Sequence, residues 1–176
     1  MKKIEVRISG LGGQGVVLAG QILGRAAAYS GKNAVQTQSY GAEARGTAAK
    51  SEVIISDGKI GFPMVRKCDV LVAMSQEAAE KNMKSLKENG VLLLDSTNVT
   101  NLPAVNATIY AIPATEIAEK AFGQKLYANM IMLGALAKIT NVVDEKSMEK
   151  AMEDTFPKNA LTVNLQAYKK GMELIG

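Results

Sequence analysis

Four glycines within six residues are the clearest sign of chemistry in this chain. Residues 10–15 read Gly-Leu-Gly-Gly-Gln-Gly, between an alternating strand pattern and an apolar helical pattern. At such a strand-to-helix turn, backbone N–H groups and the helix dipole favour an anion, and glycine permits a tight turn and close approach. Gly12, Gly13 and Gly15 are therefore candidate anion-binding positions. Together with Gly10, the spacing also satisfies the dinucleotide fingerprint G-x-G-x-x-G.

The strand that should complete a dinucleotide site lacks the residue that such a site requires. In NAD-binding domains, an acid near the end of the second strand holds the ribose hydroxyls. Here the short predicted strand 34–37 is followed by Gln38 and Ser39, and the next acid is Glu43, in the following loop. The glycine turn also lacks the Lys-Ser/Thr ending of a P-loop. Two interpretations of this turn therefore remain: it binds an anion, or it serves close packing alone.

A second candidate is the polar loop 39–46, Ser-Tyr-Gly-Ala-Glu-Ala-Arg-Gly. Arg45 could pair with a carboxylate or a phosphate, and Glu43 would orient it. Tyr40 could stack on, or hydrogen-bond to, a ligand or a loop of a partner. The alternative is a surface turn held by a Glu43–Arg45 ion pair. The functional interpretation makes this loop a wall beside the glycine turn.

Other reactive side chains are sparse, and we predict neither a catalytic residue nor a metal site. The chain has no histidine, which removes the commonest general base and the usual metal ligand. Its one cysteine, Cys68, cannot form an internal disulfide or hold an iron–sulfur cluster, and a lone buried cysteine is typical of a core. The nine methionines are expected in the core. We expect Asp95 to cap a helix or turn, and Asn129 to bond a neighbouring backbone.

Composition and charge point to a globular protein without a nucleic-acid footprint. The 176 residues are 47% hydrophobic and 22% charged, and the net charge of +4 comes from scattered lysines and arginines. Residues 1–7 alternate charged and apolar side chains, as a strand does and a signal peptide does not. The longest nearly apolar run, 127–137, is about half of the ~20 residues that a bilayer span requires. We expect a single domain, 1–176, in the cytoplasm, with no membrane or nucleic-acid partner.

The periodicity predicts a Rossmann-like three-layer α/β fold with a mixed, mostly parallel sheet, an added antiparallel hairpin and a helical C-terminal part. The predicted strands are 4–8, 34–37, 49–55, 70–74, 91–95 and 107–112. Turn 56–59 should form the hairpin. Ser75 should cap a helix that stops at Asn89-Gly90. The later helices are expected at 115–122, 126–139, 144–155 and 159–174. The first strand carries one polar face, which should lie under polar cover or a partner subunit.

Five motifs in order give the chain a recognisable resemblance. They are Gly-Leu-Gly-Gly-Gln-Gly-Val at 10–16, Gln-Thr-Gln-Ser-Tyr-Gly-Ala-Glu-Ala-Arg-Gly at 36–46, Val-Ile-Ile-Ser-Asp at 53–57, Asp-Val-Leu-Val-Ala-Met-Ser at 69–75, and Asn129 followed by Leu133-Gly134-Ala135. Together they resemble the gamma subunit of the 2-oxoacid:ferredoxin oxidoreductases over nearly the whole chain. Segment 36–46 is more similar to the 2-oxoglutarate and branched-chain type than to the pyruvate type. Thr47-Ala48 departs from the small residue or glycine expected there.

The resemblance implies a multi-subunit, oxygen-sensitive enzyme that converts a 2-oxoacid, with 2-oxoglutarate preferred, and coenzyme A to acyl-CoA, CO2 and reduced ferredoxin. Thiamine diphosphate, Mg and the Fe-S clusters would be held by alpha, beta and delta-type partner subunits. The gamma subunit would enclose the site or the coenzyme A without carrying a cofactor alone. Two other classes remain: a free-standing NAD(P)- or nucleotide-binding Rossmann-like protein, and a nucleotide-sensing regulatory domain, for which no effector-specific feature is present.

Overall fold

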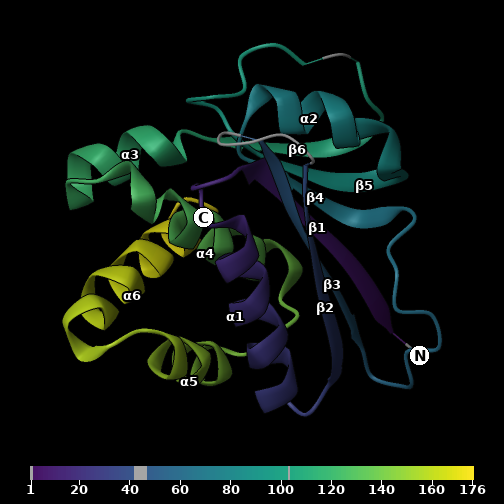
Figure 1. Cartoon of the computed structure of the whole chain (residues 1–176), viewed down its shortest axis with the longest axis horizontal. Helices are drawn as coiled ribbons and strands as arrows, with labels where there is room; N and C mark the ends of the chain where they lie inside the picture. The colour runs from purple at the N-terminus through teal and green to yellow at the C-terminus, as the bar shows by residue number, and fades with distance from the viewer. Residues whose placement is uncertain (1, 42–46, 103) are drawn as a thin grey trace.

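The computed structural model describes residues 2–41, 47–102 and 104–176, which form one six-stranded sheet with helices on both faces (Figure 1). The strands are β1 (Lys3–Leu11), β2 (Asn33–Tyr40), β3 (Ala48–Ser56), β4 (Cys68–Ala73), β5 (Leu86–Asp95) and β6 (Ala107–Ile112). The helices are α1 (Val16–Tyr29), α2 (Gln76–Asn82), α3 (Ala114–Phe122), α4 (Ala128–Thr140), α5 (Glu145–Thr155) and α6 (Lys158–Glu173), with short 3-10 turns η1 (Met83–Ser85) and η2 (Lys125–Tyr127).

The strand order β2-β3-β1-β4-β5-β6 confirms the mixed, mostly parallel sheet. β1, β4, β5 and β6 run parallel, whereas β3 is antiparallel to both of its neighbours, β1 and β2. In a dinucleotide-binding sheet, the second strand lies directly beside the first. Here β3 separates them, so the end of β2 lies two strands away from the glycine turn.

The predicted position of the antiparallel hairpin was wrong. The consecutive strands β2 and β3 form the antiparallel pair, and no such pair flanks the turn at 56–59. After Ser56 the chain continues without a strand until Cys68. The physical reason is that β1 and β2 already pair with both edges of β3, so no edge remains for a strand that turns back.

The larger core lies between the sheet and helices α1, α4, α5 and α6 (Figure 1). Val6, Ile8 and Val53 point to this face from β1 and β3, and buried methionines fill it. The predicted core role of Met130, Met132 and Met148 is confirmed, because each is at most 1% exposed. The α2 face has a smaller core, formed by Ile54, Val65, Cys68, Leu71, Ala73, Ala79, Leu86, Leu92, Leu94 and Val99.

The polar face of β1 lies under polar cover, one of the two predicted arrangements. Arg7 is 5% exposed, and its Nε and Nη2 donate to Glu52 Oε2 over 2.9 and 2.7 Å. Beside it, Lys87 Nζ lies 3.2 Å from Glu5 Oε2 and 3.0 Å from Asp69 Oδ1. Burial lowers the pKa of Lys87, but hydrogen bonds to Asp69 and Glu5 outweigh burial and leave the pKa above its ordinary value. The Arg7–Glu52 pair satisfies charges that would otherwise be costly to bury on this face.

The helix after Ser75 is shorter than predicted, although Ser75 caps it by accepting from Ala78 N. α2 ends at Asn82, and the chain passes through η1 into β5 at Leu86. Burial of Leu86 in the α2-face core draws this segment onto the sheet. Asn89 and Gly90 therefore lie within a strand and do not terminate a helix. The strand 107–112 and the four later helices lie within two residues of their predicted bounds.

Candidate functional site

The glycine turn has the predicted strand-to-helix geometry. β1 ends at Leu11, and α1 begins at Val16 behind Gly15, whose φ of 75° is left-handed. Gly13 has a φ of 92°. A Cβ at Gly15 would also overlap the amide of Asn129. Glycine is thus required at Gly13 by backbone conformation and at Gly15 by both conformation and space.

The N–H groups of this turn are partly used within the fold. Gly12 N–H donates to Thr47 O over 2.8 Å, and Leu11 N–H donates to Gln14 Oε1 over 2.7 Å. The Gln14 side chain also donates to Met74 O, which ties the turn to the end of β4. Because Gly12 is engaged, an anion at this turn would have to use Gly13, Gly15 and the first turn of α1, where no side chain caps the helix.

Asn129 has the role that the sequence predicts. It is 4% exposed on α4, and its Nδ2 donates to Gly15 O over 3.3 Å. Asp95 likewise caps: its carboxylate accepts from Thr115 N over 3.2 Å and from Thr115 Oγ1 over 2.5 Å at the start of α3. Both side chains hold elements together around the carboxyl ends of the parallel strands.

One hollow lies beside Gly13 at these strand ends. Its volume is about 230 Å³, and it is lined by Gly13, Gln14, Met74, Asn98, Thr115, Lys125, Leu126 and Ala128. Open α/β sheets bind ligands at this edge. Asn98 Nδ2 donates to Met74 O and Thr115 Oγ1, so much of the polar lining holds neighbouring elements together. Lys125 supplies a positive charge.

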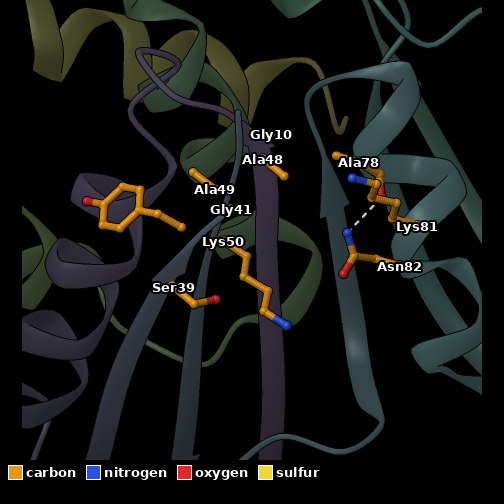
Figure 2. Close-up of a pocket in the computed structure, with 10 residues that line it drawn as sticks. Gly10, Ser39, Gly41, Ala48, Ala49, Lys50, Ala78, Lys81 and Asn82 are labelled. Carbon is orange, nitrogen blue, oxygen red and sulfur yellow. Dashed lines mark hydrogen bonds between the residues drawn. The ribbon is translucent and has the colours of Figure 1, made fainter. Parts of the chain in front are cut away.

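A second hollow, of about 320 Å³, lies on the α2 face of the sheet (Figure 2). It is lined by Gly10, Ser39, Tyr40, Gly41, Ala48, Ala49, Lys50, Ala78, Lys81 and Asn82. Figure 2 shows Ser39 and Lys50 on the side of β2 and β3, opposite Lys81 and Asn82 on α2. Two ammonium groups on one hollow favour an anionic ligand. Asn82 is fixed there by donating to Ala78 O and accepting from Arg7.

The structure places three of the predicted site residues on these two hollows, whereas Gly12 and Gly15 line neither. Gly10 and Tyr40 line the second hollow, and Gly13 lines the first. The bond from Gly12 N–H to Thr47 O places the residue that follows loop 39–46 beside the glycine turn. Glu43 and Arg45 lie outside the described residues. The proposed ligand contacts of Gly10, Gly12, Gly13, Gly15, Tyr40, Glu43 and Arg45 stay predictions.

Sequence analysis missed Lys50 and Lys81. Strand alternation alone could have placed Lys50 on the same face of β3 as Glu52, but not opposite Ser39, because that contact depends on register. Lys81 follows Glu77 by one helical turn and lies 2.6 Å from its carboxylate, which is the usual pattern of an exposed helix face. Only the packing of α2 against β1 brings it to the hollow.

Cys68 is a core residue, as predicted. Its side chain is fully buried, and burial raises the pKa of its thiol to about 11, away from the range of a reactive thiolate. In the described part of the chain, no group of three His, Cys, Asp or Glu side chains is arranged to hold a metal ion. Across the same residues, no helix combines the length and the apolarity that a bilayer crossing needs.

Comparison with known proteins covers nearly the whole chain. The chain is 53% identical over 173 residues to the 2-oxoglutarate synthase subunit KorC of Methanocaldococcus jannaschii, covering 97% of this chain and 92% of that protein. The gamma subunit of a keto/oxoacid ferredoxin oxidoreductase from Geobacter sulfurreducens matches with a TM-score of 0.88 at 46% identity, over 98% of both chains.

A larger enzyme contains the same fold. The 2-oxoglutarate:ferredoxin oxidoreductase from Magnetococcus marinus, solved with 2-oxoglutarate, coenzyme A and succinyl-CoA bound, matches with a TM-score of 0.90 at 27% identity. The match covers 99% of this chain but 31% of that one. Residues 5–174 also match the family described as pyruvate ferredoxin/flavodoxin oxidoreductase. The chain therefore belongs to the pyruvate ferredoxin/flavodoxin oxidoreductase family.

Proposed function

We propose that this chain is the gamma subunit of a multi-subunit 2-oxoacid:ferredoxin oxidoreductase with 2-oxoglutarate as the preferred substrate. The complex would convert the 2-oxoacid and coenzyme A to acyl-CoA, CO2 and reduced ferredoxin. The observation that carries the proposal is the 53% identity to a 2-oxoglutarate synthase subunit over 92% of that subunit's length. The match to 31% of a single larger chain supports the same proposal, since it indicates a unit that works within an assembly.

The chemistry of this chain's own side chains supports a division of labour. Cys68 is its one cysteine and is buried in the core, and the chain has no histidine. It therefore lacks the thiolates that an Fe-S cluster needs. We assign thiamine diphosphate, Mg and the clusters to alpha, beta and delta-type partner subunits, and we assign this chain no catalytic residue.

The role proposed for this chain is a wall of the site that receives an anionic part of coenzyme A or of the oxoacid. Lys50 brings a positive charge to the 320 Å³ hollow, which Lys81, ion-paired with Glu77, and Tyr40 also line. Arg45, in the adjoining loop, would add a guanidinium able to bind a phosphate or carboxylate in a fork. Gly13 and Gly15 would offer backbone N–H groups on the other side of the turn. A hollow of this size holds part of a ligand, so a partner subunit would complete the site.

The test is steady-state kinetics of reconstituted complexes that carry Arg45→Ala or Lys50→Ala. A lost charged hydrogen bond should raise the apparent KM for coenzyme A or the oxoacid about tenfold, with kcat nearly unchanged. Lys146→Ala, an exposed lysine on helix α5, is the matched control and should behave as wild type. Wild-type KM values in both site variants would contradict the proposed wall.

The alternative of a free-standing NAD(P)-binding protein has no support in the topology, since β3 separates β2 from β1. Equilibrium dialysis of the isolated chain against NAD, ATP and coenzyme A tests it directly. We expect no tight binding of NAD. Purification from the native source should bring down thiamine- and cluster-binding chains with this one, and a chain that purifies alone while binding NAD would overturn the proposal.

A further inference from the structure

The segment 57–67, between β3 and β4, exposes two large apolar side chains close together. Phe62 is 51% exposed and Met64 is 63% exposed, with Pro63 between them. Six large hydrophobic side chains are at least 41% exposed among the residues that the structure describes, and only in this segment do two of them fall within three residues. Single exposed apolar residues are ordinary, whereas grouped ones mark interaction surfaces.

This segment is anchored at both ends. At its start, Asp57 N–H donates to Lys2 O over 3.1 Å, and Asn33 Nδ2 donates to Gly58 O over 2.8 Å. Near its end, Val65 is buried in the α2-face core, and its carbonyl accepts from Arg7 Nη2 over 3.1 Å. The two exposed apolar side chains are thus presented on a fixed backbone, which lowers the entropy lost on binding.

The rim of this apolar segment is positively charged. Arg66 lies with its Cζ 4.7 Å from the centre of the Phe62 ring, and Lys67 follows it. Lys59 lies in the same segment, and Asp57 is its one acid. Such a surface is complementary to an apolar pocket that carries carboxylates at its edge. Pairing with a second copy of itself would bring like charges together, which disfavours a homodimer through this surface.

The segment begins at the opposite end of the sheet from the glycine turn. β3 ends where Ser56 pairs with Lys3, whereas Gly10 and Leu11 pair with the start of β3. A protein held at the start of this segment therefore lies at the end of the sheet away from the glycine turn.

From these observations we infer that segment 57–67 docks into an apolar pocket edged by carboxylates on another subunit of the oxidoreductase complex. Phe62 and Met64 are the apolar anchors, and Arg66 and Lys67 supply charge complementarity. The inference rests on the proposed function in so far as it requires partner subunits. It goes beyond that proposal by naming the surface through which this chain is held and the chemistry of the surface that receives it.

The experiment compares complexes formed by the full-length, tagged chain co-expressed with its partner subunits. The double variant Phe62→Ser with Met64→Ser should lower partner recovery at least about tenfold, as loss of central anchors does. Arg66→Glu with Lys67→Glu should weaken assembly and reduce its sensitivity to salt. Ile109→Ser, which removes an exposed apolar residue (45%) from edge strand β6, is the control and should assemble normally. Circular dichroism and thermal unfolding should show that every variant is folded.

Three outcomes of this experiment would contradict the inference. If the folded Phe62→Ser/Met64→Ser chain recovers partners as wild type does, docking through this segment is wrong while the proposed function stands. If the wild-type chain recovers no thiamine- or cluster-binding partner, the proposed function fails and this docking fails with it. If the segment instead forms homodimers that the double variant abolishes, its occupant is a second copy, and the inference is overturned.

Discussion

The two faces of the sheet are built for different purposes (Figure 1). Four helices cover one face with an apolar core. The other carries a seven-residue helix, the segment 57–67, a buried ion-pair network and a hollow lined by two lysines. Stability is thus concentrated on the face covered by α1, α4, α5 and α6, the α1 face, which frees the α2 face to keep the polar groups that a ligand or a partner needs.

The largest effect is expected where α4 and α6 cross on the α1 face. Gly171 and Gly134 let the two helices touch, since a Cβ on Gly171 would overlap the Ile131 carbonyl and a Cβ on Gly134 that of Tyr168. Backbone atoms cannot move aside as a side chain can. Gly171→Ala should lower the free energy of unfolding by about 3 kcal/mol or more, measured by urea denaturation.

Gly61→Ala is the matched control for that substitution, because a Cβ there meets no atom within 4 Å. It should change stability by less than about 0.5 kcal/mol. Equal and small effects at Gly171 and Gly61 would show that the α1 face is not the rigidly packed one.

On the α2 face, stability should depend on paired charge rather than on packing. Arg7→Met leaves the Glu52 carboxylate, 15% exposed, without its partner and removes a donor from Val65 O. We expect the free energy of unfolding to fall by about 2–3 kcal/mol. This loss is smaller than the loss for a fully buried ion pair, because the Glu52 carboxylate is partly exposed. The double variant Arg7→Met with Glu52→Leu should recover most of this loss. Additive losses in that double-mutant cycle would show that the two residues act independently.

Much of the fold followed from the sequence because local patterns decide it. Alternation placed β1 and β3, and Ser75 marked the helix start that it caps. The errors came where tertiary pairing decides: the edges of β3 were already occupied, and burial of Leu86 turned an expected helix end into a strand. No local pattern encodes either effect.

The candidate site was harder to predict from the sequence, because tertiary pairing decides it as well. Gly10 and Tyr40 could be selected from composition and spacing, and both line the same hollow. Lys50 and Lys81 lie 31 residues apart in sequence numbering, on a strand and on a helix, and each has an ordinary surface pattern locally. Their meeting depends on the register of β3 and on the docking of α2 against β1, which only the assembled sheet defines.

A further difference between the faces lies in how pH affects them. Burial of Cys68 in the α2-face core raises the pKa of its thiol from 9.0 to about 11. The folded state therefore holds this proton where the unfolded state has lost it, so stability falls as pH rises from 9 to 11. The contribution of the protonated Cys68 thiol to the free energy of unfolding is fully present below pH 9. It should shrink by about 2 kcal/mol by pH 11.

Urea unfolding at pH 8 to 11 of wild type and Cys68→Ala isolates this thiol from the tyrosines and lysines that titrate in the same range. The wild type should lose more stability over this interval than the variant does. Parallel pH profiles would mean that the thiol ionises equally in both states and that the core around it is open.

The smallest expected effect concerns Asn129, a buried polar side chain of α4 that donates to the glycine turn. Asn129→Ala removes the donor to Gly15 O and leaves that carbonyl with only its helical partner, Ala19 N. We expect a loss of about 1–2 kcal/mol and faster hydrogen exchange in the first turn of α1. Asn164→Ala is the control: it is also buried, but it donates within its own helix, to Ala160 O. If both variants lose the same stability and exchange at the turn is unchanged, Asn129 is a packing residue, and the α1 face stabilises the site through apolar contact alone.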